Sequence, residues 1–105
     1  MIDERLKQIA DHYGLDEQLN MLQEECAELI QAVSKYRRKE KLGVTNLYEE
    51  MTDVKIMLQQ VDYLLDKKFS PLGIMPQNSY NYFSETKIKR QLERIANEEK
   101  ENDNG

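Results

Sequence analysis

The sequence predicts an all-α protein, an antiparallel bundle of about four helices that associates with further copies of itself. Apolar residues recur at intervals of three and four along most of the chain, which is the spacing of one face of a helix. Charged residues make up 33% of the 105 positions, and only 4 glycines and 2 prolines interrupt the pattern. Such a composition is typical of a helical protein with much of its surface in water.

The length and charge of the chain narrow its organisation and its partners. About one domain with one core is expected, over residues 1–100, followed by a disordered tail at 101–105. The net charge of −5 argues against nucleic acid and against an anionic membrane as partners. One cysteine cannot form an intrachain disulfide and is compatible with a reducing compartment. No apolar run is long enough to cross a bilayer, so we expect a cytoplasmic protein.

The first two helices are predicted from apolar spacing and from residues that favour helix ends. The first covers residues 2–13, includes Tyr13 in its apolar face, and ends at Gly14, because glycine readily adopts the conformation that follows a helix. The second begins after Asp16, a favourable capping residue. Its buried stripe is predicted to comprise Leu19, Leu22, Cys26, Leu29, Val33 and Tyr36.

Two further helices are predicted, with an apolar loop between them. Asn46, with Glu49 three positions later, resembles a capping box and opens the third helix. Its stripe comprises Leu47, Met51, Val54, Leu58, Val61 and Leu65. The segment 69–83 contains both prolines and is expected to be a loop that packs on the body or on a partner. Ser84 then caps a last helix, whose narrow stripe is Ile88, Leu92 and Ile95.

Matching acidic motifs lie on the second and third helices. "EECAE" occupies residues 24–28, and "EEMTD" occupies residues 49–53. At about 100° per residue, each motif places two acids on the same flank of its apolar stripe. If the helices pack antiparallel, four carboxylates point at one volume, those of Glu25, Glu28, Glu50 and Asp53.

Whether the two acid pairs lie opposite each other along the helix axes depends on where the two helices are connected. Because each helix rises about 1.5 Å per residue, the two pairs lie opposite each other only if both are equally far from the connection. The connection must then be centred near residue 39 or 40. We therefore predict that the second helix ends near Tyr36 and that most of "RRKEKLGVT" is loop or frayed turn.

Four clustered carboxylates without His or Cys are the donors that hard cations prefer. Mg²⁺ is the first candidate and Mn²⁺ the second. Without a cation, the four acids would raise one another's pKa values and oppose folding. The competing interpretation is an ordinary solvated face, because Glu-rich helices are common. The repetition of the pair at the same angle beside the core favours the metal site.

Taken together, the two motifs resemble the EExxE…ExxD signature of the all-α nucleotide pyrophosphohydrolases. These are the MazG-like proteins, related to dimeric dUTPases and dCTP pyrophosphatases, and the resemblance covers roughly residues 10–95. It implies Mg²⁺-dependent hydrolysis of an NTP or dNTP to the monophosphate and pyrophosphate. It also implies a homodimer or homotetramer whose sites are completed by a neighbouring chain.

The same resemblance implies roles for individual residues. The metal ligands would be Glu25, Glu28, Glu50 and Asp53. Glu24 and Glu49 would assist catalysis by orienting the attacking water. On the last helix, three basic residues share one face and would bind the outer phosphates: Lys87, Arg90 and Arg94. The alternative for these three is that they simply face water.

A second class of function is also compatible with the sequence. The chain could be a non-catalytic helical oligomerisation or protein-interaction module, whose acids merely keep it soluble. Titration with Mg²⁺ separates the two classes, because only a metal site gives a saturable increase in thermal stability.

Overall fold

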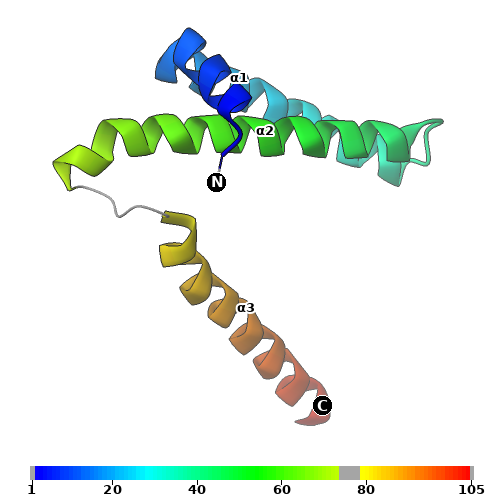
Figure 1. Ribbon diagram of the computed structural model, residues 1–105. Helices are drawn as coiled ribbons and strands as arrows, with labels where there is room; N and C mark the ends of the chain where they lie inside the picture. Colours follow the sequence, from blue (N-terminus) through cyan, green and yellow to red (C-terminus); the bar gives the residue numbers. More distant parts are fainter. Residues whose placement is uncertain (1, 74–78, 105) are drawn as a thin grey trace.

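The protein is helical over the residues that the structure describes, 2–73 and 79–104 (Figure 1). The computed structural model contains α1 (Glu4–Arg37), α2 (Gly43–Phe69), one turn of 3₁₀ helix η1 (Ser70–Leu72) and α3 (Ser79–Asn104). The predicted all-α class is thus confirmed. Within these residues, no helix is long and apolar enough to cross a membrane.

The helices α1 and α2 form an antiparallel hairpin, and α3 extends away from it (Figure 1). Among the described residues, no Cα atom of α3 lies within 8 Å of one in α1, α2 or η1. One chain therefore forms a two-helix hairpin with a separate third helix.

Helix α1 is a single long helix with a bend at Gly14. It begins after Asp3, whose carboxylate accepts a hydrogen bond from the Arg5 backbone N–H at 2.9 Å. Gly14 has φ 81° and ψ 169°, which a residue with a side chain rarely adopts. The sequence correctly indicates a break at Gly14, but the helix resumes directly and Asp16 lies within it. The arm before the bend, residues 4–13, turns across α2 (Figure 1).

The connection between α1 and α2 is short and tightly packed. Helix α1 ends at Arg37, one residue from the predicted end, and residues 38–42 join it to α2. Leu42 adopts a left-handed conformation, and a Cβ atom on Gly43 would lie 3.2 Å from the Tyr36 Cα atom. Because glycine permits this close approach, α2 begins at Gly43 and not at Asn46, where a cap was predicted.

The two helices meet along a seam with a seven-residue repeat, written abcdefg with a and d at the seam. Each seam residue is buried or half-buried. The a positions are Leu15, Leu22 and Leu29 on α1, and Leu47, Val54 and Val61 on α2. The d positions are Gln18, Glu25 and Ala32 on α1, and Gly43, Glu50, Met57 and Leu64 on α2.

Much of the predicted apolar stripe of each helix is exposed. The exposed members follow each a position by four residues, at position e: Leu19, Cys26, Val33, Met51, Leu58 and Leu65. Tyr13 and Tyr36, also expected to be buried, are 48% and 50% exposed. The prediction of burial was wrong for the e positions because each helix of the hairpin has only one long helical neighbour, which covers a and d but not e. Tyr13 lies in the arm before the bend at Gly14, and Tyr36 lies in the last turn of α1.

The N-terminal arm is attached to the C-terminal half of α2 by a polar cluster. The Asp11 carboxylate accepts a hydrogen bond from the Tyr63 hydroxyl at 2.9 Å and pairs with the Lys67 ammonium group at 3.1 Å. The ammonium groups of Lys7 and Lys67 lie over the Tyr63 ring. Ala10 of the arm is fully buried. These contacts fix the direction of the arm after the bend at Gly14.

The predicted loop 69–83 is largely helical where the structure describes it. Helix α2 continues to Phe69 and is followed by η1, and α3 begins at Ser79, while residues 74–78 lie outside the described residues. Ser84 is not a cap but lies within α3, where its hydroxyl donates to the Asn81 carbonyl at 3.4 Å.

Helix α3 also includes most of the segment 101–105, for which the sequence predicts disorder. It continues to Asn104, and residue 105 lies outside the described residues. Glutamate and lysine, both good helix formers, predominate at 98–101 and favour this continuation.

Candidate metal centre

Two of the predicted ligands lie inside the seam. Glu25 and Glu50 occupy d positions on α1 and α2, where an apolar residue would be usual, and both are half-buried. One carboxylate oxygen of each, Oε2, is buried and has no hydrogen-bond partner among the described residues. A buried charged oxygen without a partner is unfavourable. These two acids therefore do not belong to an ordinary solvated face.

A third carboxylate, that of Glu28, joins them from the flank of the seam. Glu25, Glu28 and Glu50 each contribute one carboxylate oxygen to a group whose members all lie within 4.8 Å of one another. Glu28 is exposed at a g position of α1, so the cluster is open to solvent on that side. The structure thus brings together three of the four predicted ligands, from two helices.

The acids of this cluster destabilise one another's charge. Burial raises the pKa of Glu25, and the negative charges of Glu28, Asp53 and Glu50 raise it further. Burial likewise raises the pKa of Glu50, with additional contributions from the charges of Glu28 and Asp53. A divalent cation among these oxygens would reverse both effects, because it favours the ionised form.

Asp53, the fourth predicted ligand, lies at the edge of the cluster. It is exposed at a g position of α2, on the same side of the seam as Glu28. It does not belong to the three residues gathered within 4.8 Å. Its charge nevertheless raises the pKa of both Glu25 and Glu50, so it lies near the cluster.

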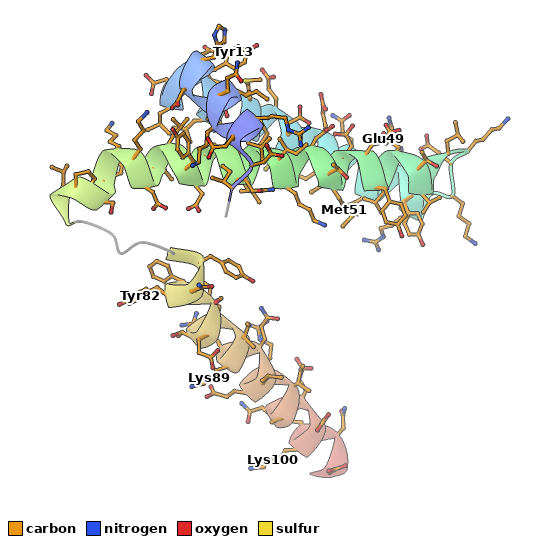
Figure 2. The ribbon with its side chains drawn as sticks, in the orientation of Figure 1. Tyr13, Glu49, Met51, Tyr82, Lys89 and Lys100 are labelled. Carbon is orange, nitrogen blue, oxygen red and sulfur yellow. The ribbon has the colours of Figure 1, made fainter. Side chains whose placement is uncertain are left out.

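The two predicted catalytic acids lie on the outer side of the motifs. Glu24 and Glu49 are both exposed. Glu49 borders a surface hollow together with Tyr48, Thr52 and Asp53, and its charge contributes to the raised pKa of Glu50. In Figure 2, Glu49 and Met51 project from opposite sides of α2. Glu49 is therefore an exposed carboxylate beside the cluster.

The predicted phosphate-binding residues are not brought to the acid cluster within one chain. Lys87, Arg90 and Arg94 are exposed and border one hollow on α3. Lys87 also borders a hollow shared with Leu58 and Asp62 of α2. Because α3 extends away from the hairpin, the basic face and the acidic face are separate within one chain (Figure 1).

Two buried glutamines next to the cluster were missed by the sequence interpretation. Gln18 is 0% exposed and Gln60 is 2% exposed, and the amide oxygen of each is buried without a partner among the described residues. Gln18 precedes Glu25 by seven positions, and Gln60 follows Asp53 by seven, so both lie about 10 Å along the seam from the acids. The seven-residue spacing was the available signal, but a search for apolar stripes passes over glutamine.

The donor set of the cluster fits a hard divalent cation. Its ligand atoms are carboxylate oxygens, and the buried, unpartnered oxygens of Glu25 and Glu50 are the observation that supports the fit. Mg²⁺ prefers such oxygen donors and retains several waters, for which the open side of the cluster leaves room. Mn²⁺ accepts the same donors.

Comparison of the chain with protein-family models, with curated proteins and with solved structures gives no match. The resemblance to MazG-like proteins therefore depends on the acidic motifs themselves. The geometry of the carboxylate cluster is the independent observation from which a function can be proposed.

Proposed function

We propose that this protein is a Mg²⁺-dependent nucleotide pyrophosphohydrolase, which converts an NTP or dNTP to the monophosphate and pyrophosphate. The observation that carries the proposal is the group of Glu25, Glu28 and Glu50, with carboxylate oxygens within 4.8 Å of one another and two of them buried without partners. The motif resemblance supplies the reaction. Among the residues that the structure describes, no basic side chain forms an ion pair with Glu25, Glu28 or Glu50, which supports a role for an added cation.

The acids have distinct roles in this proposal. Mg²⁺, when bound, neutralises charge on the phosphates and polarises a phosphoryl oxygen. Four residues would hold it: Glu25, Glu28, Glu50 and Asp53. Glu24 and Glu49 are both exposed, and the charge of Glu49 acts on Glu50 of the cluster. These two acids would orient the attacking water and accept its proton, so that attack occurs in line with the departing pyrophosphate.

The basic residues of α3 would bind the outer phosphates in an assembly of several chains. Lys87, Arg90 and Arg94 share one exposed face, and Arg binds phosphate in a bidentate manner. Since α3 is separate from the hairpin of its own chain, this role requires a neighbouring copy in a homodimer or homotetramer. A cytoplasmic location accords with a nucleotide substrate.

The direct test is a panel of NTPs and dNTPs incubated with the protein and Mg²⁺. Release of pyrophosphate together with the nucleoside monophosphate is expected for at least one nucleotide, and a chelator should abolish it. Glu28→Gln is the control for a contaminating activity. If no nucleotide releases pyrophosphate, the enzymatic proposal is wrong.

A second candidate function is favoured by the exposed apolar residues at the e positions. Their exposure suits a non-catalytic oligomerisation or protein-interaction module. Thermal unfolding at increasing Mg²⁺ concentrations separates the candidates, because a metal site stabilises the fold as the concentration exceeds Kd. A scaffold without a site would show no saturable shift.

A further inference from the structure

One face of α3 carries aromatic residues at its start and basic residues beyond them. Five side chains follow one another at intervals of three, four, three and four residues, which places them on the same face of the helix. We name them the α3 stripe, and all five are exposed: Tyr80, Phe83, Lys87, Arg90 and Arg94. The stripe runs for about 20 Å along the helix axis.

The aromatic end of the α3 stripe borders a hollow between α2 and α3. Helix α3 begins beside the C-terminal half of α2, and side chains of both helices line a hollow of about 480 Å³ (Figure 1). Most of its wall is apolar, from Leu58, Tyr80 and Phe83. The other lining residues are polar or charged: Gln59, Asp62, Ser84 and Lys87. A mainly apolar wall with a few polar groups, at this volume, is typical of a small-molecule site.

The Phe83 ring is oriented by its neighbour. The Tyr82 ring meets it edge-on, with the ring centroids 4.9 Å apart and an angle of 87° between the ring planes. Tyr82 lies at the start of α3, as Figure 2 shows. Phe83 is 43% exposed, so part of its ring remains accessible from the hollow. An accessible aromatic ring can stack on the planar ring of a nucleobase.

The basic end of the stripe begins at the hollow. Lys87 borders this hollow and two others along α3, of which one includes Arg90 and the other both Arg90 and Arg94. Among the described residues, none of these three cations forms an ion pair. A ligand in the hollow therefore meets an uninterrupted row of three positive charges. Charge complementarity favours a ligand with several phosphates, which Arg binds in a bidentate manner.

A single nucleotide matches the α3 stripe better than a nucleic-acid strand does. The aromatic residues gather at one end of the stripe, whereas a strand would need rings along its whole length. The chain also carries a net charge of −5, which disfavours a long polyanion. Acids follow the stripe on the same helix: Glu98, Glu99 and Glu101.

Asp62 gives the hollow a preference among bases. It is exposed on α2 and forms no ion pair with another described residue. An ionised carboxylate only accepts hydrogen bonds, and the exocyclic amino group of cytosine, adenine or guanine donates them. Uracil and thymine carry carbonyl oxygens and no amino group, and these oxygens repel a carboxylate.

We propose that the hollow between α2 and α3 binds the base of a nucleoside triphosphate and selects a base with an exocyclic amino group. The base stacks on Phe83 and donates to Asp62, and the phosphates lie along Lys87, Arg90 and Arg94. The inference rests on the proposed function only in taking this nucleotide to be the substrate, whose phosphates would meet the acid cluster of a neighbouring copy. Binding in the hollow itself requires neither Mg²⁺ nor turnover.

The test is equilibrium dialysis of nucleotides against the full chain with a chelator present, so that no nucleotide is hydrolysed. Three pairs differ in whether the base carries an amino group: CTP with UTP, ATP with ITP, and GTP with ITP. The amino-bearing member should bind at least about 10-fold more tightly in at least one pair. No saturable binding, or equal affinities within every pair, would overturn the proposal.

Asp62→Asn should remove the preference, because an amide donates as well as accepts hydrogen bonds. Asp16→Asn is the matched control, since Asp16 is exposed on α1 and does not border the hollow. This control should keep the wild-type preference. A preference that survived in the Asp62→Asn variant would contradict the assignment of Asp62.

Phe83→Ala should weaken the binding of every nucleotide at least about 5-fold, because the base loses its stacking partner. The control is Ile88→Ala, since Ile88 is 49% exposed on the same helix but lies outside the stripe. Far-UV circular dichroism shows whether both variants keep their helices. Unchanged affinity in the Phe83→Ala variant would overturn the proposal. Tighter binding of a short deoxycytidine strand than of dCTP would also overturn it, in favour of a nucleic-acid ligand.

The two kinds of measurement separate this inference from the enzymatic proposal. Base-dependent binding without pyrophosphate release from any nucleotide would uphold the hollow as a nucleotide site and reject the hydrolase. Pyrophosphate release without an effect of Phe83→Ala or Asp62→Asn on nucleotide binding would uphold the hydrolase and reject the hollow.

Discussion

Glu25 and Glu50 are the residues whose positions are hardest to explain without a cation. At d positions of a helix seam, an apolar side chain would stabilise the pair by burial, whereas a glutamate loses hydration. Each glutamate has a raised pKa and a buried oxygen without a partner among the described residues. Such a local conflict between sequence and fold is expected at a functional site.

Removal of one ligand should abolish turnover and leave the fold intact. Glu28→Gln and Asp53→Asn each delete a charge that faces the cluster but keep the size of the side chain. We expect turnover to fall at least about 100-fold, since even residues that support a metal ligand contribute 10–100-fold. The helical circular dichroism signal should persist.

Glu17→Gln is the matched control for these variants. Glu17 is exposed on α1 and does not belong to the acid cluster, so its loss should not affect turnover. If both ligand variants retained wild-type turnover, the catalytic site would lie elsewhere.

The stability of the metal-free protein should fall as the pH rises from about 4.5, the ordinary pKa of a glutamate. Because the folded-state pKa values of Glu25 and Glu50 are raised, the folded state binds more protons than the unfolded state within this window. The stability is therefore present at low pH and is lost as the pH passes the folded-state values.

The measurement is the urea midpoint against pH in the presence of a chelator, for the wild type and for a Glu25→Gln, Glu50→Gln variant. The decline should be smaller in the variant. Asp66, whose pKa is also raised by burial, is present in both proteins and cancels in the difference. Asp3 has a pKa of about 2 and titrates below the window. A wild-type midpoint that rose through the window would contradict the assignment.

At the scale of the helices, the sequence predicts the connection well and the buried face poorly. The end of α1 at Arg37 follows from the requirement that the two acid pairs be level. The predicted apolar stripes of the two helices fall on the a and e positions, because the residues at both positions are apolar in this chain. The d positions, which are buried in the seam, include the polar residues Gln18, Glu25 and Glu50. An apolar pattern alone cannot reveal a seam in which polar residues occupy two of the three d positions of α1.

Helix boundaries were missed where backbone conformation and not residue type decides them. Leu42 adopts a left-handed conformation without a side-chain cap, so the start of α2 at Gly43 lacks the polar capping residue on which the prediction at Asn46 depends. The start of α3 at Ser79 was hidden by the aromatic residues that follow it, which suggest an apolar loop. The four acids were predicted as one group, and the structure places three of them together with Asp53 at the edge.

The arm of α1 should loosen when its polar cluster is disrupted. Tyr63→Phe removes the hydroxyl that donates to Asp11 at 2.9 Å and leaves the ring in place. We expect faster amide hydrogen exchange in residues 4–13 and no change in α3, because only the arm depends on this contact.

Tyr48→Phe is the control, because Tyr48 is 69% exposed and lies far from the arm in the sequence and at the other end of α2. Unaltered exchange in the arm of the Tyr63→Phe variant would show that the apolar contacts of Ala10 and its neighbours suffice.

At the scale of the whole molecule, the hairpin has two different sides. The g positions on one side carry Glu28 and Asp53 of the acid motifs, and the e positions on the other side are apolar and exposed. The acid cluster and the exposed apolar residues therefore lie on different sides of the α1–α2 seam. The three clustered carboxylates come from one chain and do not require a partner.

A monomeric variant should therefore keep its metal site. If Leu19→Glu, which places a charge at an exposed e position, gives a folded monomer, its melting temperature should still rise with Mg²⁺ and saturate as in the wild type. Turnover should fall more than metal binding does, because the basic residues of α3 would act from a neighbouring copy. Loss of the Mg²⁺ response in the folded monomer would show that the site is shared between chains.

The most direct test of the central claim is a calorimetric titration of Mg²⁺ into the full chain, alongside the Glu25→Gln, Glu50→Gln variant. The account predicts saturable binding to the wild type, with stabilisation of about 2.7 kcal/mol when Mg²⁺ exceeds its Kd about 100-fold. It predicts no binding to the variant, which should be the more stable of the two without metal. Absence of saturable binding to the wild type, or equal binding to both proteins, would contradict the account.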